Sequence, residues 1–309
     1  MNCSSIHSVK NILLGQAIIY ALMFFFGVIL NVFALRIFCC KLIKWTETRV
    51  YMTNLAITDC LFLFTLPFNM VYNMLKIHDI YIHRYLNILC LVWQGVYFIN
   101  RYMSIFLITI IALDRYIAIR YPLQAKNIRS PLKSVLVCGL FWIIIISIVL
   151  VSIHVDKDEY KGICFRTIYR IASVPSFAAV IWGFVIPLII LSFCSIQIIK
   201  KLRRKKKIHL HEKNLIQKSI NIILANMTTF IICFSPLHVL YFISFIDSKN
   251  DSCSTFKETL FLNVAAILAN ANCCLDVFCY YFVSQEFQEA SIVLKTQSQA
   301  SKNQDTEII

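Results

Sequence analysis

The sequence has little charge and few residues that interrupt helices. Only 15% of its 309 residues are Asp, Glu, Lys or Arg, whereas soluble domains average about 25%. It contains 6 glycines and 6 prolines, which favours long helices over a sheet rich in turns. Hydrophobic residues make up 59% of the chain, above the roughly 45–50% of a soluble domain. This balance excludes an ordinary soluble protein and favours a helical membrane protein.

Seven apolar stretches account for the excess of hydrophobic residues. With its flanking residues, each reaches the roughly 20 residues that a helix needs to cross a bilayer. The second stretch continues upstream past Asp59, and the third continues past Arg101 to Leu113. The stretches free of Asp, Glu, Lys and Arg are 11–35, 60–75, 85–100, 134–155, 171–199, 219–246 and 259–275. We therefore predict an all-α membrane protein, built as a seven-transmembrane helix bundle.

The distribution of Lys and Arg predicts how the bundle lies in the membrane. The loops after the first, third and fifth stretches carry more of these residues than the N-terminal segment and the other loops do. Because basic residues gather on the cytoplasmic side, we predict a multi-pass plasma-membrane protein with an extracellular N-terminus and a cytoplasmic C-terminus. The densest basic run, 202–207, is expected to meet anionic membrane lipids or a protein partner, so no nucleic-acid partner is predicted.

Four segments are predicted along the chain, and none is a second globular domain. The segment after the last span has apolar and small residues at helical spacing, which is typical of a short amphipathic eighth helix on the membrane surface. The final segment is polar and carries Ser and Thr that can accept phosphate. The boundaries are 1–11 for an extracellular tail, 12–283 for the transmembrane domain, 284–294 for the amphipathic helix and 295–309 for a cytoplasmic tail.

Cysteines and glycosylation sequons also separate by side of the membrane. Four of the 13 cysteines, Cys3, Cys90, Cys164 and Cys253, fall on the predicted extracellular side, where disulfides form. Four cysteines pair in three ways, and Cys90–Cys164 with Cys3–Cys253 is one of them. Two Asn-X-Ser sequons on the same side predict glycosylation at Asn2 and Asn250.

Arg101 is the one full charge within the apolar stretch 85–113. As a helix residue it lies about 16 Å below Cys90 at 1.5 Å per residue, too deep to reach the headgroups. Such a cation needs a partner. Either a buried acid, Asp59 or Asp276, holds it permanently, or it binds an anionic ligand. We predict the ligand, because a guanidinium binds carboxylate and phosphate in bidentate fashion.

Other residues around Arg101 are predicted to complete a ligand site. Tyr97 lies one turn above it on the same helix face. Trp93 and Tyr241 offer further aromatic walls. Arg166 and Arg170 follow Cys164 in the sequence and would add positive charge above the site if that loop lies across its mouth. The alternative is that these loop arginines are only solvated.

Asp59, Ser104, Asn272 and Asp276 are polar residues in otherwise apolar spans. Two carboxylates in such a place need a cation, a proton or both. Sodium with oxygen ligands is one interpretation, and a protonated carboxyl in a hydrogen-bond network is the other. No other metal or cofactor is predicted.

Two prolines fall within spans five and six, Pro187 and Pro236. Each removes a backbone hydrogen bond and bends its helix. Phe230 and Phe234 lie below Pro236 on one face of span six, so this segment is predicted to act as a hinge.

Taken together, motifs in all seven spans resemble those of the class A (rhodopsin-like) G-protein-coupled receptors. The residues that carry the resemblance are Asn31, 54–59 (Asn-Leu-Ala-Ile-Thr-Asp), Cys90, Asp114-Arg115-Tyr116, Trp142, Pro187, Phe230, Cys233-Phe234-Ser235-Pro236 and 276–280 (Asp-Val-Phe-Cys-Tyr). The chain departs from the family pattern in span six, where Phe234 replaces a common Trp, and in span seven, where Asp276-Val277 replaces Asn-Pro. Ser195 replaces a Tyr in span five.

The resemblance narrows to one branch of this class over 45–56, 100–105, 271–276 and 286–291. This branch implies activation by small anionic ligands, such as aromatic carboxylic acids or lipids like lysophosphatidic acid. The stretch 275–283 is equally similar to a lysophosphatidylinositol-type receptor of the same family. A receptor of that type is therefore the alternative to the branch just described.

The resemblance also implies partners and a switch. Heterotrimeric G proteins would bind at Arg115 and Leu123, and arrestin would bind after phosphorylation of the tail. Asp114 would hold Arg115 in the resting state. The switch residues that the family pattern implies are Asp114, Arg115, Tyr116, Phe230, Phe234, Pro236, Asp276 and Tyr280.

Two other classes of function compete with a receptor. A transporter of organic anions is disfavoured because the sequence shows no related halves and predicts an odd number of spans. An enzyme is disfavoured because no His/Glu metal set or nucleophile–base pair stands out within the spans.

Overall fold

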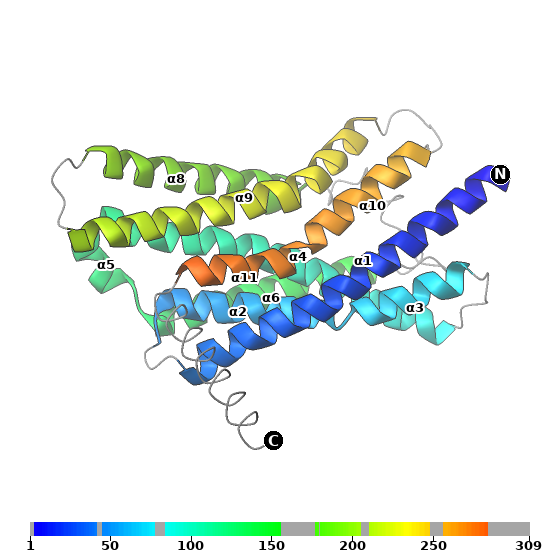
Figure 1. Ribbon diagram of the computed structural model, residues 1–309, viewed down its shortest axis with the longest axis horizontal. Coiled ribbons are helices and arrows are strands. Elements are labelled where there is room, and N and C mark those ends of the chain that lie inside the picture. Colours follow the sequence, from blue (N-terminus) through cyan, green and yellow to red (C-terminus); the bar gives the residue numbers. More distant parts are fainter. Residues whose placement is uncertain are drawn as a thin grey trace, which may run out of the picture.

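The computed structural model describes residues 3–41, 45–77, 84–155, 177–178, 180–204, 210–247 and 256–283. Within these ranges the chain is helical and contains no strand, and seven helices are long and apolar enough to cross a membrane. They lie side by side in one bundle (Figure 1). The predicted all-α, seven-transmembrane fold is confirmed.

The helices follow one another along the chain with few described connections. They are α1 (Cys3–Arg36), α2 (Glu47–Leu63), α3 (Leu66–Ile77), α4 (Arg84–Arg120), α5 (Pro122–Ile128), α6 (Pro131–Val155), α8 (Ile186–Arg204), α9 (Leu210–Asp247), α10 (Phe256–Asn270) and α11 (Asn272–Val283). Two short π-helical segments, η1 (Ile37–Lys41) and η3 (Ile181–Val185), extend α1 and precede α8.

The N-terminus and α5 lie at opposite ends of the bundle (Figure 1). We call these ends the predicted outer end and the predicted cytoplasmic end. α1 already begins at Cys3, so the segment predicted as a tail is helical from that residue, and the membrane-length part begins at Lys10. The predicted amphipathic helix 284–294 and the tail 295–309 lie outside the described residues, so both stay predictions.

Span two is broken into α2 and α3 at a position that the sequence explains. Pro67 has no N–H to donate, and its ring crowds the carbonyl one turn back. Phe64 and Thr65 form a turn instead, with the N–H of Thr65 donating to the carbonyl of Phe62 at 2.8 Å. The Thr65 hydroxyl donates to the same carbonyl at 2.6 Å, so the turn leaves few polar groups exposed to lipid.

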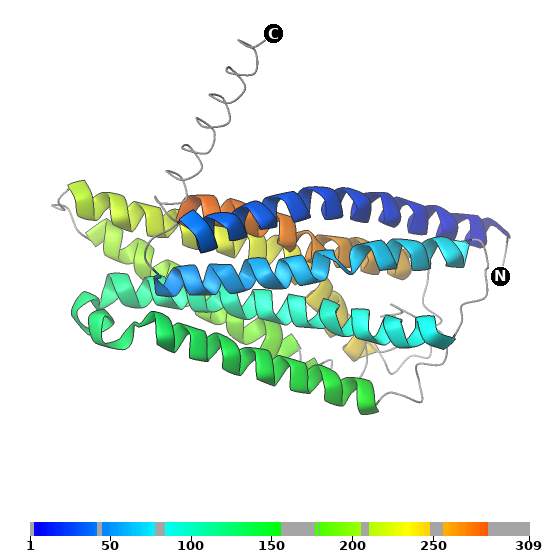
Figure 2. The same ribbon diagram turned by 90° about the horizontal axis from the view of Figure 1, so that it is seen from below.

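α4 is the central helix of the bundle. It packs against α2, α6, α8 and α9, and seen from below it lies between α2 and α6 (Figure 2). α6 lies at the edge of the bundle, where it contacts α2 and α4 and exposes Leu132, Leu136 and Ile143 by 65–69%. In a membrane these side chains face lipid, because hydrocarbon accepts apolar surface that water does not.

Two amide hydrogen bonds tie neighbouring helices together near mid-bundle. The Asn31 side chain of α1 donates to the carbonyl of Cys273 in α11 at 2.8 Å. The indole N–H of Trp142 in α6 donates to the Asn54 side chain of α2 at 3.2 Å. Asn31, Asn54 and Trp142 are among the residues that carry the family resemblance. Their hydrogen bonds fix the register of neighbouring helices in a setting without water.

Candidate functional site

Arg101 lies in the middle of α4 and is 3% exposed. Its Nη1 donates to the Tyr241 hydroxyl of α9 at 3.2 Å, and its Nη2 donates to the Tyr97 hydroxyl. The guanidinium carbon lies 4.3 Å from the centre of the Tyr97 ring and 5.8 Å from that of Phe98. Phenols and aromatic faces therefore surround the cation.

A permanent ion pair, the alternative considered for Arg101, is absent from the part of the chain that the structure describes. The ion pairs found there all lie at the predicted cytoplasmic end. Neither Asp59 nor Asp276 pairs with Arg101. Phenolic hydroxyls and ring faces stabilise a cation less than a carboxylate does, so the guanidinium keeps capacity for an anion.

A cavity opens beside Tyr97 toward the predicted outer end. Its volume is about 70 Å³. Side chains of α1, α3, α4 and α10 form most of its wall, and Tyr97 is one of them. Arg101 is not in the wall, because the Tyr97 ring covers its guanidinium.

The other predicted ligand residues fall into three groups. Tyr241 touches Arg101 as described. Trp93 packs on Phe68 with ring centres 5.9 Å apart, away from the cavity wall. Arg166 and Arg170 lie outside the described residues, so their part in the site stays a prediction.

His238 is a site residue that the sequence interpretation missed. It is 0% exposed and stacks on Phe184, with ring centres 4.7 Å apart and 10° between the planes. Its Nδ1 lies 2.7 Å from the Phe234 carbonyl, and its ring centre is 6.0 Å from that of Tyr241. Helical spacing could have found it, because Phe230, Phe234, His238 and Tyr241 share one face of span six.

Phe230 and Phe234, two of the predicted switch residues, lie in an aromatic cluster of α9. Phe230 and Phe234 are both 0% exposed, and their rings meet edge to face with centres 5.6 Å apart. Phe184 stacks on Phe230 at 5.4 Å. Pro236 lies inside α9 just above them, so a helix bend and a cluster of rings coincide. Whether they act as a hinge stays a prediction.

The four residues predicted to hold sodium are all buried, with exposures of 0–1%. Asn272 donates to Asp276 Oδ2 at 3.5 Å. The Ser104 hydroxyl and the Oδ1 atoms of Asn272 and Asp276 have no hydrogen-bond partner among the described residues. In the amide orientation that satisfies both its atoms, Asn100 donates to Asp59 Oδ1 at 3.3 Å. Oxygen atoms left without donors suit a cation of the sodium type.

No larger metal cluster competes with this interpretation within the described ranges. They bring together no group of three or more His, Cys, Asp or Glu side chains able to hold a metal ion. The predicted sodium ligands include only two carboxylates, and the remaining donors are a hydroxyl and an amide oxygen. Hard cations such as sodium accept such neutral oxygens.

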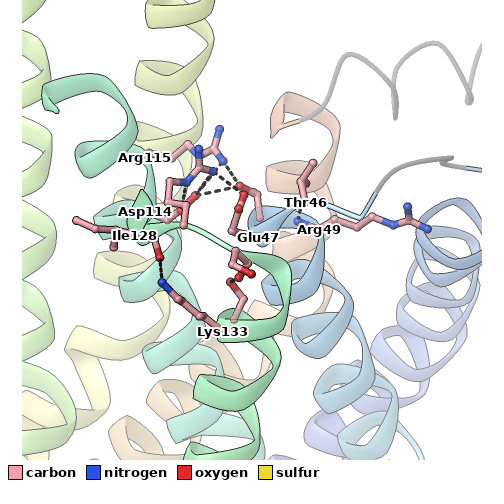
Figure 3. A network of polar contacts seen from close by, with 11 residues as sticks. Thr46, Glu47, Arg49, Asp114, Arg115, Ile128 and Lys133 are labelled. Atoms are coloured by element: carbon pink, nitrogen blue, oxygen red, sulfur yellow. Dashed lines mark hydrogen bonds and ion pairs between the residues drawn. The ribbon is translucent and has the colours of Figure 1, made fainter. Parts of the chain in front are cut away.

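Asp114 and Arg115 lie in a polar network at the predicted cytoplasmic end (Figure 3). Nη2 of Arg115 donates to Asp114 Oδ2 at 2.9 Å and also to the hydroxyl of Thr48 in α2. The Thr48 hydroxyl lies 3.1 Å from the same carboxylate oxygen. Arg115 is thus held by Asp114 and Thr48, and the assignment of this contact to a resting state stays a prediction.

Arg129 is a second partner of Asp114, and the sequence interpretation did not foresee it. Its Nε donates to Asp114 Oδ1 at 2.7 Å and its Nη2 donates to Oδ2 at 3.1 Å. Nη2 also lies 3.0 Å from a Glu47 carboxylate oxygen at the start of α2. Burial lowers the pKa of Arg129, but its bonds to Asp114 raise it more, so the pKa lies above its usual range. Arg129 stays cationic and ties the start of α6 to α2 and α4.

Four other residues named in the sequence analysis remain to be placed: Leu123, Tyr116, Tyr280 and Ser195. Leu123 in α5 is 82% exposed, as an apolar contact for a partner requires. The Tyr116 ring lies 5.5 Å from that of Phe193 in α8. The Tyr280 side chain is not described. Ser195 donates to the carbonyl of Leu191 within its own helix at 2.7 Å.

Cys90 is disulfide-bonded. Its predicted partner Cys164 lies outside the described residues, as do Cys253, Asn2, Asn250 and the side chain of Cys3. The pairing of these cysteines and both glycosylation sites therefore stay predictions.

The two ends of the bundle differ as they do in a transmembrane receptor. A cavity and a covered cation lie toward one end, a network of ion pairs lies at the other, and continuous helices join them. The chain belongs to the rhodopsin family of 7 transmembrane receptors, whose model matches residues 30–301. It is a multi-pass plasma-membrane receptor and not an enzyme.

Curated relatives place the chain within this family. It is 37% identical to mouse G-protein coupled receptor 35 over 293 residues, which cover 94% of this chain and 92% of the relative. It is 33% identical to mouse G-protein coupled receptor 55 over 302 residues, covering 92% and 90%. Human lysophosphatidic acid receptor 4 is 30% identical over 285 residues, covering 88% and 75%. The narrower resemblance, to the branch that includes G-protein coupled receptor 35, is confirmed.

Membership of the family implies two kinds of partner. Its receptors couple to G proteins and respond to small molecules. Arrestin and membrane lipids stay predictions for this chain.

Proposed function

We propose that this receptor is activated by small anionic ligands, either aromatic carboxylic acids or lipids like lysophosphatidic acid, and passes the signal to heterotrimeric G proteins. The observation that carries the proposal is the burial of Arg101 together with the kind of groups that it contacts. It is buried, and its described contacts are phenolic hydroxyls and rings. A bidentate carboxylate or phosphate is the partner that a guanidinium in this setting lacks.

The proposed signal runs along α4. With the N-terminus outside, as the distribution of Lys and Arg predicts, the ligand enters the end that holds the cavity, and the G protein binds the end that holds Arg115 and Leu123. A ligand transmits a signal only if it binds one global state better than another, typically by about 1–3 kcal/mol. In the active state Arg115 leaves Asp114 and Thr48 and becomes available to the G protein.

Two supports favour an anion over other ligand classes. The tyrosine Tyr97 stands beside Arg101 where an amine receptor needs an acid, so a cationic ligand has no partner there. The name of one relative, lysophosphatidic acid receptor 4, states an anionic lipid. A lysophosphatidylinositol-type ligand is the second candidate, favoured by the similarity to G-protein coupled receptor 55.

We also propose sodium as an allosteric modulator. Asp59, Ser104, Asn272 and Asp276 would hold it. The support is the set of buried oxygens without hydrogen-bond donors described above. A cation there would compensate two buried carboxylates whose charges are otherwise costly. No further cofactor is proposed.

The experiment is a screen of G-protein activation against small acids and lysophospholipids, repeated with Arg101→Ala and Arg101→Lys. Bonds to a charged group contribute roughly 1.5–3 kcal/mol each, so Arg101→Ala should lower agonist potency by about 10- to 100-fold or more. Arg101→Lys keeps the charge and should lose less. Cell-surface labelling confirms that each variant is expressed. An unchanged potency in Arg101→Ala would refute the anion site.

A further inference from the structure

The wall of the cavity beside Tyr97 contains both apolar and polar side chains but no charged one. Its wall includes five amide side chains, Gln16, Asn69, Gln94, Asn263 and Asn270, and none of the residues in the wall is Asp, Glu, Lys, Arg or His. Amides exchange hydrogen bonds with neutral groups and do not select an ion. The cavity therefore suits a different part of a ligand from the part that Arg101 binds.

Several of these amides already have partners. Gln16 and Asn270 both donate to the Tyr20 hydroxyl, at 3.0 and 2.9 Å. Asn69 accepts a bond of 3.0 Å from Asn73. Gln94 differs, because its Oε1 is buried and has no hydrogen-bond partner among the described residues. A buried acceptor without a donor is costly, so a ligand O–H or N–H at this point would be bound favourably.

Gln94, Tyr97 and Arg101 lie on one face of α4, at spacings of three and four residues. At 1.5 Å per residue, Gln94 lies about 10 Å above Arg101 along the axis and about 5 Å above Tyr97. The guanidinium reaches up to the Tyr97 ring. A ligand that touches both groups must therefore hold its acid and its donor about 5–10 Å apart.

Tyr97 controls whether one ligand can reach both places. Its ring forms part of the cavity wall and covers the guanidinium, and its hydroxyl accepts a hydrogen bond from Nη2 of Arg101. As it stands the cavity is small, at about 70 Å³. Rotating this one side chain would widen the cavity and uncover the cation together.

We propose that Tyr97 is a gate between the cavity and Arg101, and that Gln94 selects acids that carry a hydrogen-bond donor. The favoured agonist is an aromatic carboxylic acid with a hydroxyl or N–H group about 5–10 Å from its carboxylate. The acid displaces the Tyr97 hydroxyl from Arg101, and the donor bonds to Gln94 Oε1. This inference rests on the proposed function, since it needs Arg101 to bind the acid.

The test compares two aromatic acids that differ only in this donor, one with a distal hydroxyl and one with a methoxy group in its place. Potency in G-protein activation is measured for wild type, Gln94→Leu and Gln197→Leu, a matched substitution in α8. Wild type and Gln197→Leu should prefer the hydroxy acid by about 5- to 10-fold. Gln94→Leu should lose this preference while its potency for the methoxy acid changes less than about threefold.

The outcomes distinguish a failure of this inference from a failure of the proposed function. If both acids activate through Arg101 but the preference persists in Gln94→Leu, or never exists in wild type, the role of Gln94 is overturned. If neither acid nor any other anion activates wild type, the proposed function fails first. Tyr97→Phe tests the gate: without the hydroxyl that occupies Nη2, both acids should gain potency equally, and a loss for both would make Tyr97 a ligand contact and not a gate.

Discussion

Arg101 and Arg115 lie on the same helix and have opposite surroundings. Arg101 is 3% exposed and contacts phenols and rings. The side chain of Arg115 is 20% exposed and contacts a carboxylate that a second arginine, Arg129, also binds. The more deeply buried cation thus has the weaker partners. The comparison shows that burial alone does not predict pairing.

Giving Arg101 an acid of its own would make it resemble Arg115, and this change has the largest expected effect. Tyr241→Glu places a carboxylate where a hydroxyl now accepts at 3.2 Å from Nη1. The internal ion pair should exclude an anionic agonist, lowering potency by about 100-fold or more. Tyr241→Gln, similar in length but neutral, is the control and should lose much less. Equal losses in the two variants would show that the hydroxyl, and not the vacancy for an acid, is what matters.

The packing beside Arg101 can be tested without touching its charge. A Cβ on Gly183 in η3 would lie 2.5 Å from the Tyr102 ring, whereas a Cβ on Gly139 in α6 would meet nothing within 4 Å. Gly183→Ala should therefore lower the free energy of unfolding by about 1–3 kcal/mol, and Gly139→Ala should be neutral or slightly stabilising. Thermal unfolding of the detergent-solubilised receptor measures both. Matching melting temperatures would mean that Tyr102 moves aside freely.

Releasing Arg115 is the corresponding change at the other end. Asp114→Asn weakens charge-assisted bonds to two arginines and should raise agonist-independent nucleotide exchange by roughly 3- to 10-fold. Glu47→Gln removes only the outer contact of Arg129 and should raise agonist-independent nucleotide exchange less. Nucleotide exchange on purified G protein, without ligand, reports both. A larger effect of Glu47→Gln would place the restraint in Arg129 and not in Asp114.

The last effect, similar in size to the preceding one, concerns the region between the two arginines. If sodium binds near Asp276, replacing sodium by a bulky organic cation at equal ionic strength should change agonist affinity by about 3- to 10-fold. Asp276→Asn should remove this dependence. Competition binding in the two salts measures it, and a dependence that survives in Asp276→Asn would assign the ion to another place.

The sequence predicted the elements of this structure that depend on one helix at a time. The lengths of the apolar stretches predicted the seven spans, and helical spacing predicted that Tyr97 lies beside Arg101. The same spacing would have found His238. Arg129 and Glu47 could not be found in this way, because their contact joins the connection between α5 and α6 to the start of α2, and nothing in either sequence selects one arginine among several. The cavity also depends on how four helices meet, and no single span encodes that.

Span seven has a different kind of break from span two, and it has a mechanical consequence. Its two halves meet at Ala271 without a proline. The N–H of Ala271 still donates to the carbonyls of Ile267 and Leu268, and its carbonyl still accepts from Cys274 and Leu275. The N–H and the carbonyl of Ala271 thus both keep partners in hydrocarbon. If the lower half, which carries Asp276, rotates about this junction, the peptide groups of Ala271 can stay hydrogen-bonded, so amide exchange there should stay slow.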